Sequence, residues 1–312
     1  MIEYTARPAS DEHYELAEGP YWDAPRERLL WVDILRGLVL EGSLAGDRVQ
    51  VSREHRFDGM VGAVVVADDG SLLVAGQERL VVIEPDGTRT PGPRIVAAGV
   101  AARINDGATD PFARFLVGTL SLGREANREC LYRVEVDGSL FAIDTDLSLS
   151  NGLAWSSDGR TFYSVDTLAG IVWKRKYSDP LGAREQFVSI DGGYPDGICI
   201  DAEGSLWVAV WGSAEVRKFS PQGEQTAVVH TSAPHTSSVA FVGRHLDRLL
   251  ITSGRQDLDA QQLAAFPDSG LLFLADVDAV GVPTTPWSRR KTSSGPRAPR
   301  APRPRGRGLQ IQ

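Results

Sequence analysis

An apolar strand–turn–strand pattern recurs six times along the 312 residues and constrains the fold more than any other feature. In each copy a small residue near the start of an apolar strand is followed by an Asp- or Gly-containing turn and then by a second apolar strand. The anchor positions are Gly19, Gly62, Gly107, Gly152, Gly197 and Ser238. Their spacings are 43, 45, 45, 45 and 41 residues, which is a near-constant period.

A period of this size matches one four-stranded propeller blade of about 40–50 residues, and propellers carry roughly 4–8 blades. The six copies therefore predict an all-β fold, a six-bladed β-propeller over residues 1–288 with a site in its central channel. A β-sandwich with accidental spacing is the alternative, which six near-equal periods disfavour. We expect Ile2–Arg7 to be a strand that completes the last blade, and Asp259–Phe266 to be a short helix within the sixth copy.

The charge of the chain divides it at residue 289. Eight of its 33 Lys and Arg residues lie from Arg289 onward, and none of its 41 Asp and Glu residues do. The segment 289–312 is rich in Pro, Arg, Gly and Ser, so it has too few apolar residues to offset its ordering entropy, and we expect it to be disordered. It lacks the interleaved aromatic residues that stack on bases, and the rest of the chain is acidic, so we expect no nucleic-acid partner.

Composition indicates a protein without disulfides or membrane anchors. The two cysteines, Cys130 and Cys199, exclude a disulfide framework and fit a reducing compartment. No apolar run approaches the roughly 20 residues of a membrane helix, and the N-terminus lacks the pattern of a secretory signal. These observations predict a cytoplasmic protein with no membrane partner, and they leave its oligomeric state open.

The residues directly before the anchors carry the candidate chemistry. They are Glu18, Val61, Asp106, Asn151, Asp196 and Ser237, which we call the ring positions. Because a repeat places equivalent residues at equivalent depth around the axis, these side chains should converge at one mouth of the channel. Three carboxylates and an amide at close range would repel one another without a cation, and oxygen ligands suit a divalent ion. Asp and Asn before Gly can instead be turn residues only.

Four motifs at these positions resemble those of the gluconolactonase, regucalcin (senescence marker protein) and luciferin-regenerating-enzyme family of six-bladed propellers. They are Glu18-Gly19-Pro20-Tyr21-Trp22, Arg103-Ile104-Asn105-Asp106-Gly107, Ser150-Asn151-Gly152-Leu153-Ala154 and Pro195-Asp196-Gly197. The resemblance implies that Glu18, Asn151 and Asp196 hold one divalent metal ion (Ca, Zn, Mn, Mg or Fe). It also implies that Arg103 and Asn105 bind the substrate.

The resemblance further implies a metal-dependent hydrolase that opens sugar lactones, such as gluconolactone, to aldonic acids, with Asp196 as general base. Some members carry an acidic residue soon after a Gly-Thr pair in the third blade. Here Gly118-Thr119 is followed by Leu120–Arg124, so that contact is missing or shifted to Glu125, which leaves the sugar open.

Two alternatives remain at the same site. One is an esterase acting on aryl or phosphate esters, and the other is a non-enzymatic propeller that binds a divalent metal. A Ser-His-Asp hydrolase is disfavoured because the sequence has no G-x-S-x-G motif.

Overall fold

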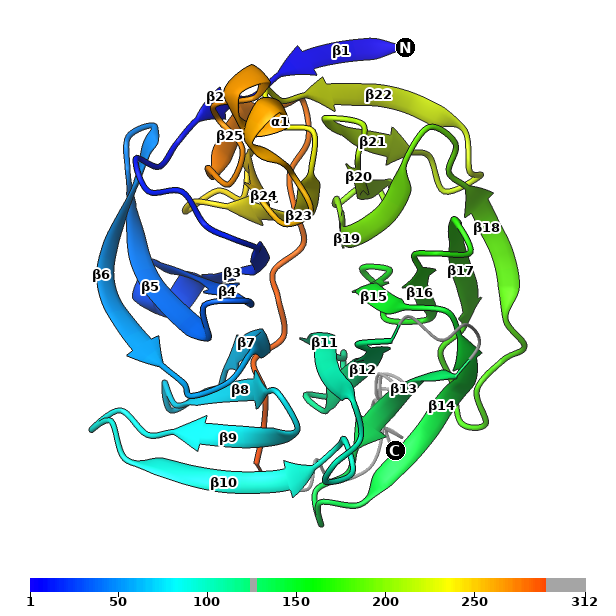
Figure 1. The fold of residues 1–312 in the computed structure, drawn as a ribbon. Helices are drawn as coiled ribbons and strands as arrows, with labels where there is room; N and C mark the ends of the chain where they lie inside the picture. Colours follow the sequence, from blue (N-terminus) through cyan, green and yellow to red (C-terminus); the bar gives the residue numbers. More distant parts are fainter. Residues whose placement is uncertain (124–127, 290–312) are drawn as a thin grey trace, which may run out of the picture.

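A computed structural model describes residues 1–123 and 128–289, and it confirms the six-bladed β-propeller (Figure 1). Apart from the N-terminal strands β1 and β2, each blade is an antiparallel sheet whose first strand in the chain lies nearest the axis. Blade one consists of β3 (Ala17–Asp23), β4 (Arg28–Asp33), β5 (Leu38–Ala45) and β6 (Arg48–Arg56). Blade two consists of β7 (Val61–Val66), β8 (Leu72–Gly76), β9 (Arg79–Ile83) and β10 (Arg89–Arg94). Blade three consists of β11 (Ala102–Thr109), β12 (Phe115–Ser121), β13 (Glu129–Val134) and β14 (Leu140–Leu147). Blade four consists of β15 (Ser150–Trp155), β16 (Thr161–Asp166), β17 (Ile171–Lys176) and β18 (Glu185–Ser189). Blade five consists of β19 (Tyr194–Ile200), β20 (Leu206–Trp211), β21 (Glu215–Phe219) and β22 (Gln225–His230). Blade six contains β23 (Thr236–Val242), β24 (Arg248–Ser253) and β25 (Phe273–Asp276).

The N-terminal segment closes the ring, but differently from the expected single strand. It forms two strands, β1 (Ile2–Thr5) and β2 (Arg7–Pro8). β1 adds to the outer edge of blade five, parallel to β22, whereas β2 completes blade six, antiparallel to β25. Ala6 between them is buried and donates its backbone N–H to the carbonyl of His230 at 2.8 Å. The segment thus covers the edges of two blades, which protects both from unwanted pairing.

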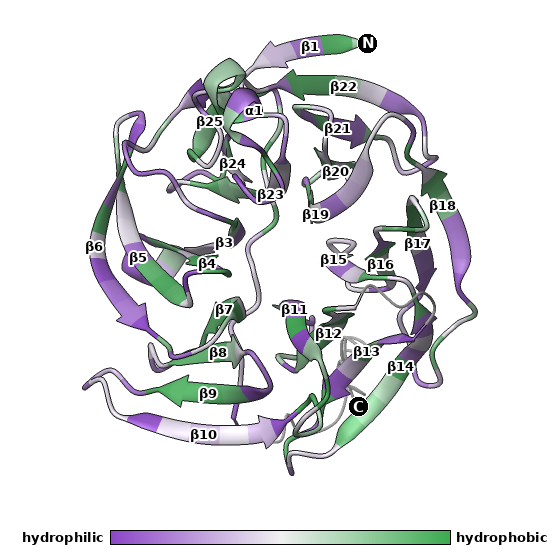
Figure 2. Ribbon diagram, viewed as in Figure 1, coloured by the Kyte–Doolittle hydropathy of each residue, from purple (hydrophilic) through white to green (hydrophobic). Residues whose placement is uncertain are grey.

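Apolar residues of neighbouring blades form the core. The hydropathy colouring shows β7 and β8 as largely apolar, while the outer strands are mixed, with polar segments on β6, β10 and β18 (Figure 2). The insertion in blade six holds the expected helix, α1 (Ala260–Ala265). Asp259 caps its N-terminus and Gln262 returns the bond to the backbone of Asp259, which forms a capping box. No helix in the described ranges is long and apolar enough to cross a membrane.

Glycine at the anchor positions allows the inner strands of adjacent blades to approach closely. A Cβ atom at Gly152 would lie 2.5 Å from the carbonyl oxygen of Asp196, and one at Gly197 would overlap Ser238 of the next blade. Any larger residue would therefore push neighbouring blades apart at the level of the ring positions. At Gly62, Gly152 and Gly197 this contact across blades requires glycine.

After β25 the chain crosses the middle of the propeller (Figure 1). It bonds to residues at or beyond the ends of the inner strands, whereas the ring positions lie at the starts of these strands. We call this segment, Val277–Arg289, the closing strap. Its backbone bonds join Val280 to Ala202 of blade five, Gly281 to Leu246 of blade six, Trp287 to Val66 of blade two, and Ser288 to Ala113 of blade three. The strap therefore ties together blades that are distant in sequence and covers the far mouth of the channel.

Candidate metal centre and active site

Every inner strand has a β-bulge at or beside its ring position. The register between the first two strands of each blade shifts at Glu18/Tyr21, Val61/Ala63, Ile104/Gly107, Asn151/Leu153, Pro195/Ile198 and Thr236/Ser238. A bulge inserts an extra residue and re-aims side chains, and bulges are common beside active sites. Six bulges at one level thus give polar residues a place near the axis within strands that are otherwise apolar.

The bulges bury the three predicted metal ligands. Glu18 in β3, Asn151 in β15 and Asp196 in β19 have exposed fractions of only 7%, 6% and 5%. Burial raises the pKa of Glu18 well above its ordinary range, and the charges of Asp196 and Asp106 raise it further. Burial also raises the pKa of Asp196, again reinforced by the charge of Asp106. The carboxylates therefore lie close enough to disfavour one another's ionisation.

Arg103 supplies a cation to the same buried site. Burial lowers its pKa to about 10, against the opposing charges of Glu18 and Asp196. Its Nη1 donates to the neighbouring carbonyl of Ile104 at 3.1 Å. When all are ionised, the carboxylates of Glu18, Asp106 and Asp196 with this guanidinium leave two uncompensated negative charges. A divalent cation would balance that charge.

The unpaired atoms at the site also fit a metal ion. Asp196 Oδ1 is buried without a hydrogen-bond partner among the described residues. The amide nitrogen of Asn151 donates to Thr167 Oγ1 at 3.1 Å, which leaves the Asn151 oxygen unused by that bond. Free carboxylate and amide oxygens are the ligands that hard divalent ions prefer. Within residues 1–123 and 128–289, no three His, Cys, Asp or Glu side chains form a ready-made metal cluster, so the candidate set is two carboxylates and an amide.

The predicted substrate residues lie on β11, beside the ring position of blade three. Arg103 and Asn105 are 5% and 6% exposed. The Asn105 amide nitrogen donates to the carbonyl of Ser150 at 2.9 Å. Because a carbonyl oxygen only accepts, this bond identifies the amide nitrogen and leaves the Asn105 oxygen as an acceptor. The pair therefore offers guanidinium donors and an amide acceptor, which suits a ligand rich in hydroxyl groups.

The third ring carboxylate, Asp106, lies near enough to Glu18 and Asp196 for its charge to raise the pKa of both, but it is not one of the predicted metal ligands. It lines a cavity of about 280 Å³ behind the ring, bounded by the inner strands and by Val282–Thr285 of the closing strap. Burial raises its pKa to about 6. Ser237 is turned to the backbone instead, since its hydroxyl donates to the carbonyl of Ala17 at 2.5 Å. Glu125 lies outside the described residues.

Sequence reasoning missed the residues that hold two of the candidate ligands. Thr167 bonds the side chain of Asn151, and Asp33 and Asp166 bond the backbone that leads into Glu18 and Asn151. None occupies a ring position. The signal that could have found the carboxylates is a Val-Asp pair at the end of the second strand of blades one and four.

Fold and site together define a class: six-bladed propellers with a buried acid–amide centre at one mouth of the channel. Comparison with known proteins is consistent with this class. Residues 16–255 match the family model described as SMP-30/Gluconolactonase/LRE-like region. Regucalcin of Danio rerio is 32% identical over 283 residues, covering 88% of this chain and 94% of that protein. The chain belongs to the SMP-30/gluconolactonase/LRE-like family.

Two further relatives bear on the site. Pentonolactonase XacC of Haloferax volcanii is 31% identical over 294 residues, covering 88% of this chain and 94% of that protein. A crystal structure described as a calcium-binding protein, regucalcin, from Agrobacterium tumefaciens superposes with a TM-score of 0.85 at 27% identity. It covers 92% of this chain and 98% of its own.

Proposed function

We propose that the protein is a carboxylic-ester hydrolase that opens sugar lactones with the help of one divalent metal ion. The observation that carries the proposal is the buried centre of Glu18, Asn151 and Asp196, with its excess negative charge, beside Arg103. Relatives named as a pentonolactonase and as a 6-deoxy-6-sulfogluconolactonase support the substrate class. The small-molecule partner is then a sugar lactone.

The metal ion would be held by Glu18, Asn151 and Asp196, as the resemblance implied. A divalent ion at this centre supplies a Lewis acid that polarises the lactone carbonyl and makes water easier to deprotonate. The calcium-binding description of the Agrobacterium regucalcin favours a hard ion such as Ca²⁺. Zn, Mn, Mg and Fe remain candidates, since each accepts carboxylate ligands.

Substrate orientation falls to the two residues of β11. The Arg103 guanidinium can donate paired, charge-assisted hydrogen bonds to lactone or hydroxyl oxygens. The free Asn105 oxygen can accept a hydrogen bond from a sugar hydroxyl. A ligand with both acceptors and donors, such as an aldonolactone, satisfies both residues at once.

Asp196 is the proposed general base. The oxygen of the Asp196 carboxylate that does not bind the metal ion can accept the proton of a water molecule as the water oxygen bonds to the carbonyl carbon. The ring C–O bond then breaks, and the released alkoxide takes a proton to give the hydroxyl group of the aldonic acid. The net reaction consumes one water and needs no further reagent.

Localisation follows from the thiols. Cys130 and Cys199 are both free, which fits a reducing compartment, and the proposal places the enzyme in the cytoplasm.

The test is a substrate panel with metal-stripped protein. Each divalent ion is added back while acid release is followed from aldonolactones, an aryl ester and a phosphotriester. Lactone opening that depends on the ion supports the proposal. Turnover confined to the aryl ester or phosphotriester would favour the esterase alternative, and metal binding without any turnover would favour the non-enzymatic one.

The Asp196→Asn variant tests the base. It keeps the size of the side chain and one oxygen ligand but loses charge and basicity. We expect a modest loss of metal affinity and a fall in turnover of about 10²–10⁴-fold at saturating metal, which is the usual contribution of a positioned base. Near wild-type turnover, with metal occupancy verified by elemental analysis, would leave Asp196 as a ligand only.

A further inference from the structure

Two buried carboxylates that the proposed reaction does not use occupy equivalent places in blades one and four. Asp33 ends β4 and Asp166 ends β16. Each pairs in register with the residue just before a candidate metal ligand: Ala17 with Asp33, and Ser150 with Asp166. Their exposed fractions are 0% and 5%. A buried carboxylate is costly unless hydrogen bonds compensate it, so their bonds show what they do.

Asp33 holds the chain that leads into Glu18. Its Oδ2 accepts the backbone N–H of Glu15 at 3.0 Å, and its Oδ1 accepts that of Leu16 at 3.2 Å. These donors lie three and two residues before Glu18. Because both oxygens are used, neither a hydroxyl nor an amide can replace the carboxylate without losing a bond.

Asp166 holds the chain that leads into Asn151 in the same way. Its Oδ1 accepts the backbone N–H of Ser148 at 3.0 Å and of Leu149 at 3.3 Å, together with the hydroxyl of Ser148. These donors again lie three and two residues before the ligand. The next residue, Thr167, accepts the amide N–H of Asn151.

The device occurs in two of the three blades that supply a candidate ligand. In blade five the residue before Asp196 is Pro195, and it pairs with the apolar Val210 instead of with a carboxylate. Propeller geometry alone therefore does not require an aspartate at this place. Blades one and four, which supply Glu18 and Asn151, have one.

We propose that Asp33 and Asp166, with Thr167, are positioning residues of the metal centre: they fix the backbone and amide orientation that aim Glu18 and Asn151 at the ion. The inference rests on the metal site of the proposed function. Residues that orient metal ligands typically change metal affinity by about 10–100-fold when they are removed. The effect should therefore appear in metal binding itself, independently of turnover.

Asp201 provides a matched control. It directly follows the inner strand β19, at the end of that strand away from Asp196. It is 0% exposed and, like Asp33, uses both oxygens: Oδ1 accepts the backbone N–H of Ser205 at 2.8 Å and Oδ2 the indole N–H of Trp207 at 3.0 Å. It follows Asp196 by five residues, beside the closing strap. Loss of the Asp201 carboxylate should destabilise the fold without disturbing the metal centre.

The experiment titrates calcium, manganese and zinc chloride, each alone, into metal-stripped protein by calorimetry, and it measures urea unfolding in parallel. Asp33→Asn and Asp201→Asn should lose similar stability. Only Asp33→Asn should bind metal about tenfold or more weakly. Equal metal affinities of Asp33→Asn and wild type would overturn the role of Asp33.

Blade four offers internal rescue. Because all three bonds of Asp166 reach Oδ1, Asp166→Asn can keep them, whereas Asp166→Ala cannot. We expect Asp166→Ala to weaken metal binding about tenfold or more and Asp166→Asn to stay near wild type. Thr167→Val should likewise weaken binding and Thr167→Ser should restore it, which keeps the test decisive if Asp166→Ala fails to fold.

The outcomes separate the two proposals. If the wild type binds a metal and Asp33→Asn, Asp166→Ala and Thr167→Val bind it equally well, the positioning role is wrong and the metal site stands. If the wild type binds none of the three ions, and binds neither magnesium nor iron(II) titrated in the same way, the metal site and the positioning role both fall.

Discussion

Because of its charge, Arg103 is the best residue at which to test substrate binding separately from metal binding. It is buried with Glu18 and Asp196, and as a cation it cannot ligate a metal ion. Its positive charge opposes a second cation at the site, while its donors suit the oxygen atoms of a sugar lactone. Removing it should therefore weaken substrate binding without weakening metal binding.

We expect Arg103→Ala to lower kcat/KM for the lactone by about 10–100-fold, since a charge-assisted hydrogen bond contributes roughly 1.5–3 kcal/mol. Metal affinity should stay unchanged or increase. Steady-state kinetics and calorimetric metal titration measure the two effects. Arg103→Lys is the control, since it keeps the charge but loses the planar pair of donors. A metal-free variant with normal kinetics would reverse the assignment.

At the scale of residues, the repeat register predicted which side chains reach the ring but not where each one points. Glu18, Asn151 and Asp196 lie at bulges of inner strands, as the shared register predicted, although their role as ligands stays a prediction. Asp106 occupies the same register but lines the cavity behind the ring. A one-residue bulge changes side-chain direction, and its geometry depends on contacts with the next blade that no local pattern encodes.

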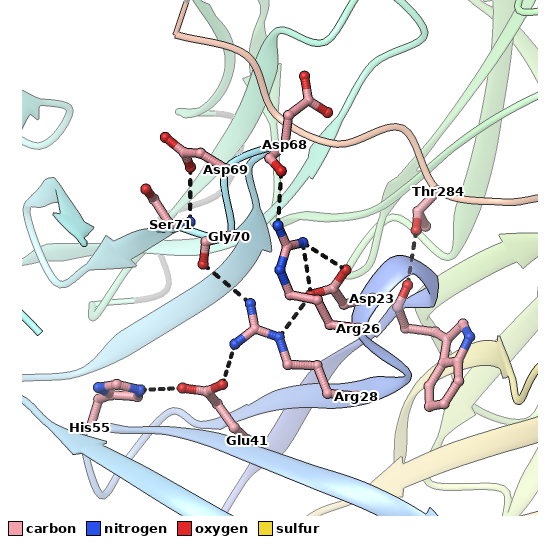
Figure 3. Close-up of polar contacts among 11 residues, drawn as sticks. Asp23, Arg26, Arg28, Glu41, His55, Asp68, Asp69, Gly70, Ser71 and Thr284 are labelled. Carbon is pink, nitrogen blue, oxygen red and sulfur yellow. Dashed lines mark hydrogen bonds and ion pairs between the residues drawn. The ribbon is translucent and has the colours of Figure 1, made fainter. Parts of the chain in front are cut away.

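At the scale of elements, a network of charged side chains joins blades one and two (Figure 3). Arg28 of β4 donates to Glu41 of β5 and, through its Nη2, to the carbonyl of Gly70 at 3.2 Å in the first turn of blade two. His55 of β6 and Glu41 share a 2.6 Å hydrogen bond. We call this set of residues the blade latch. It is an element-level contact, because three strands of one blade hold a turn of the next.

The blade latch predicts a specific pH dependence. Burial raises the pKa of Glu41, but the hydrogen bond from His55 and the charge of Arg28 outweigh burial and hold that pKa below its ordinary 4.5. A folded-state pKa below the unfolded value stabilises the protein fully above about pH 4.5, and the contribution is lost as the pH falls through the folded pKa.

Glu41→Gln should therefore cost about 2 kcal/mol of unfolding free energy at pH 7.5, and its difference from wild type should shrink below pH 4.5. Urea unfolding between pH 7.5 and 3 measures this. Glu54→Gln, which removes the exposed partner of Arg56, is the control and should change stability by less than about 1 kcal/mol. A difference for Glu41→Gln that stays constant in acid would contradict the role of its charge.

The elements themselves could be predicted to different degrees. The helix α1 matches the expected Asp259–Phe266 because its capping box is local in sequence. The N-terminal segment differs from the single strand that was expected. Its partners β22 and β25 are more than 200 residues away, and because they belong to different blades the segment forms two strands that meet at Ala6. Strands whose partners are distant depend on ring closure, which the local pattern of Ile2–Arg7 does not contain.

At the scale of the whole molecule, ring closure combines β2 on blade six with the closing strap. The family match ends at residue 255, so the strap, Val277–Arg289, lies beyond it. Trp287 packs against the core of blades one to three, and Thr284 Oγ1 donates to the carbonyl of Trp22 at 3.3 Å. Arg289 extends this contact through an ion pair with Glu84 at 3.0 Å. The strap thus contacts five blades and closes the cavity behind the ring.

These contacts refine the proposed division of the chain. From the sequence, the propeller was predicted to end at residue 288 and to be followed by a disordered segment, 289–312. Arg289 still contacts blade two, whereas residues 290–312 lie outside the described structure. We propose residues 290–312 as the dispensable part. Two truncations on either side of the closing strap therefore make a matched pair.

A protein ending at Arg289 should unfold at the wild-type temperature and keep full activity. A protein ending at Asp276 should lose of order 5 kcal/mol of unfolding free energy, because four backbone hydrogen bonds at about 1 kcal/mol each and the packing of Trp287 are removed.

The shorter protein, ending at Asp276, should also have an open far mouth of the channel. Cys199, which lines the cavity, reports this opening, since in a Cys130→Ser background its reaction with methyl methanethiosulfonate should accelerate only in the shorter protein. If the protein ending at Asp276 melted like the full chain with Cys199 equally protected, the strap would be a surface segment, and β2 alone would close the propeller.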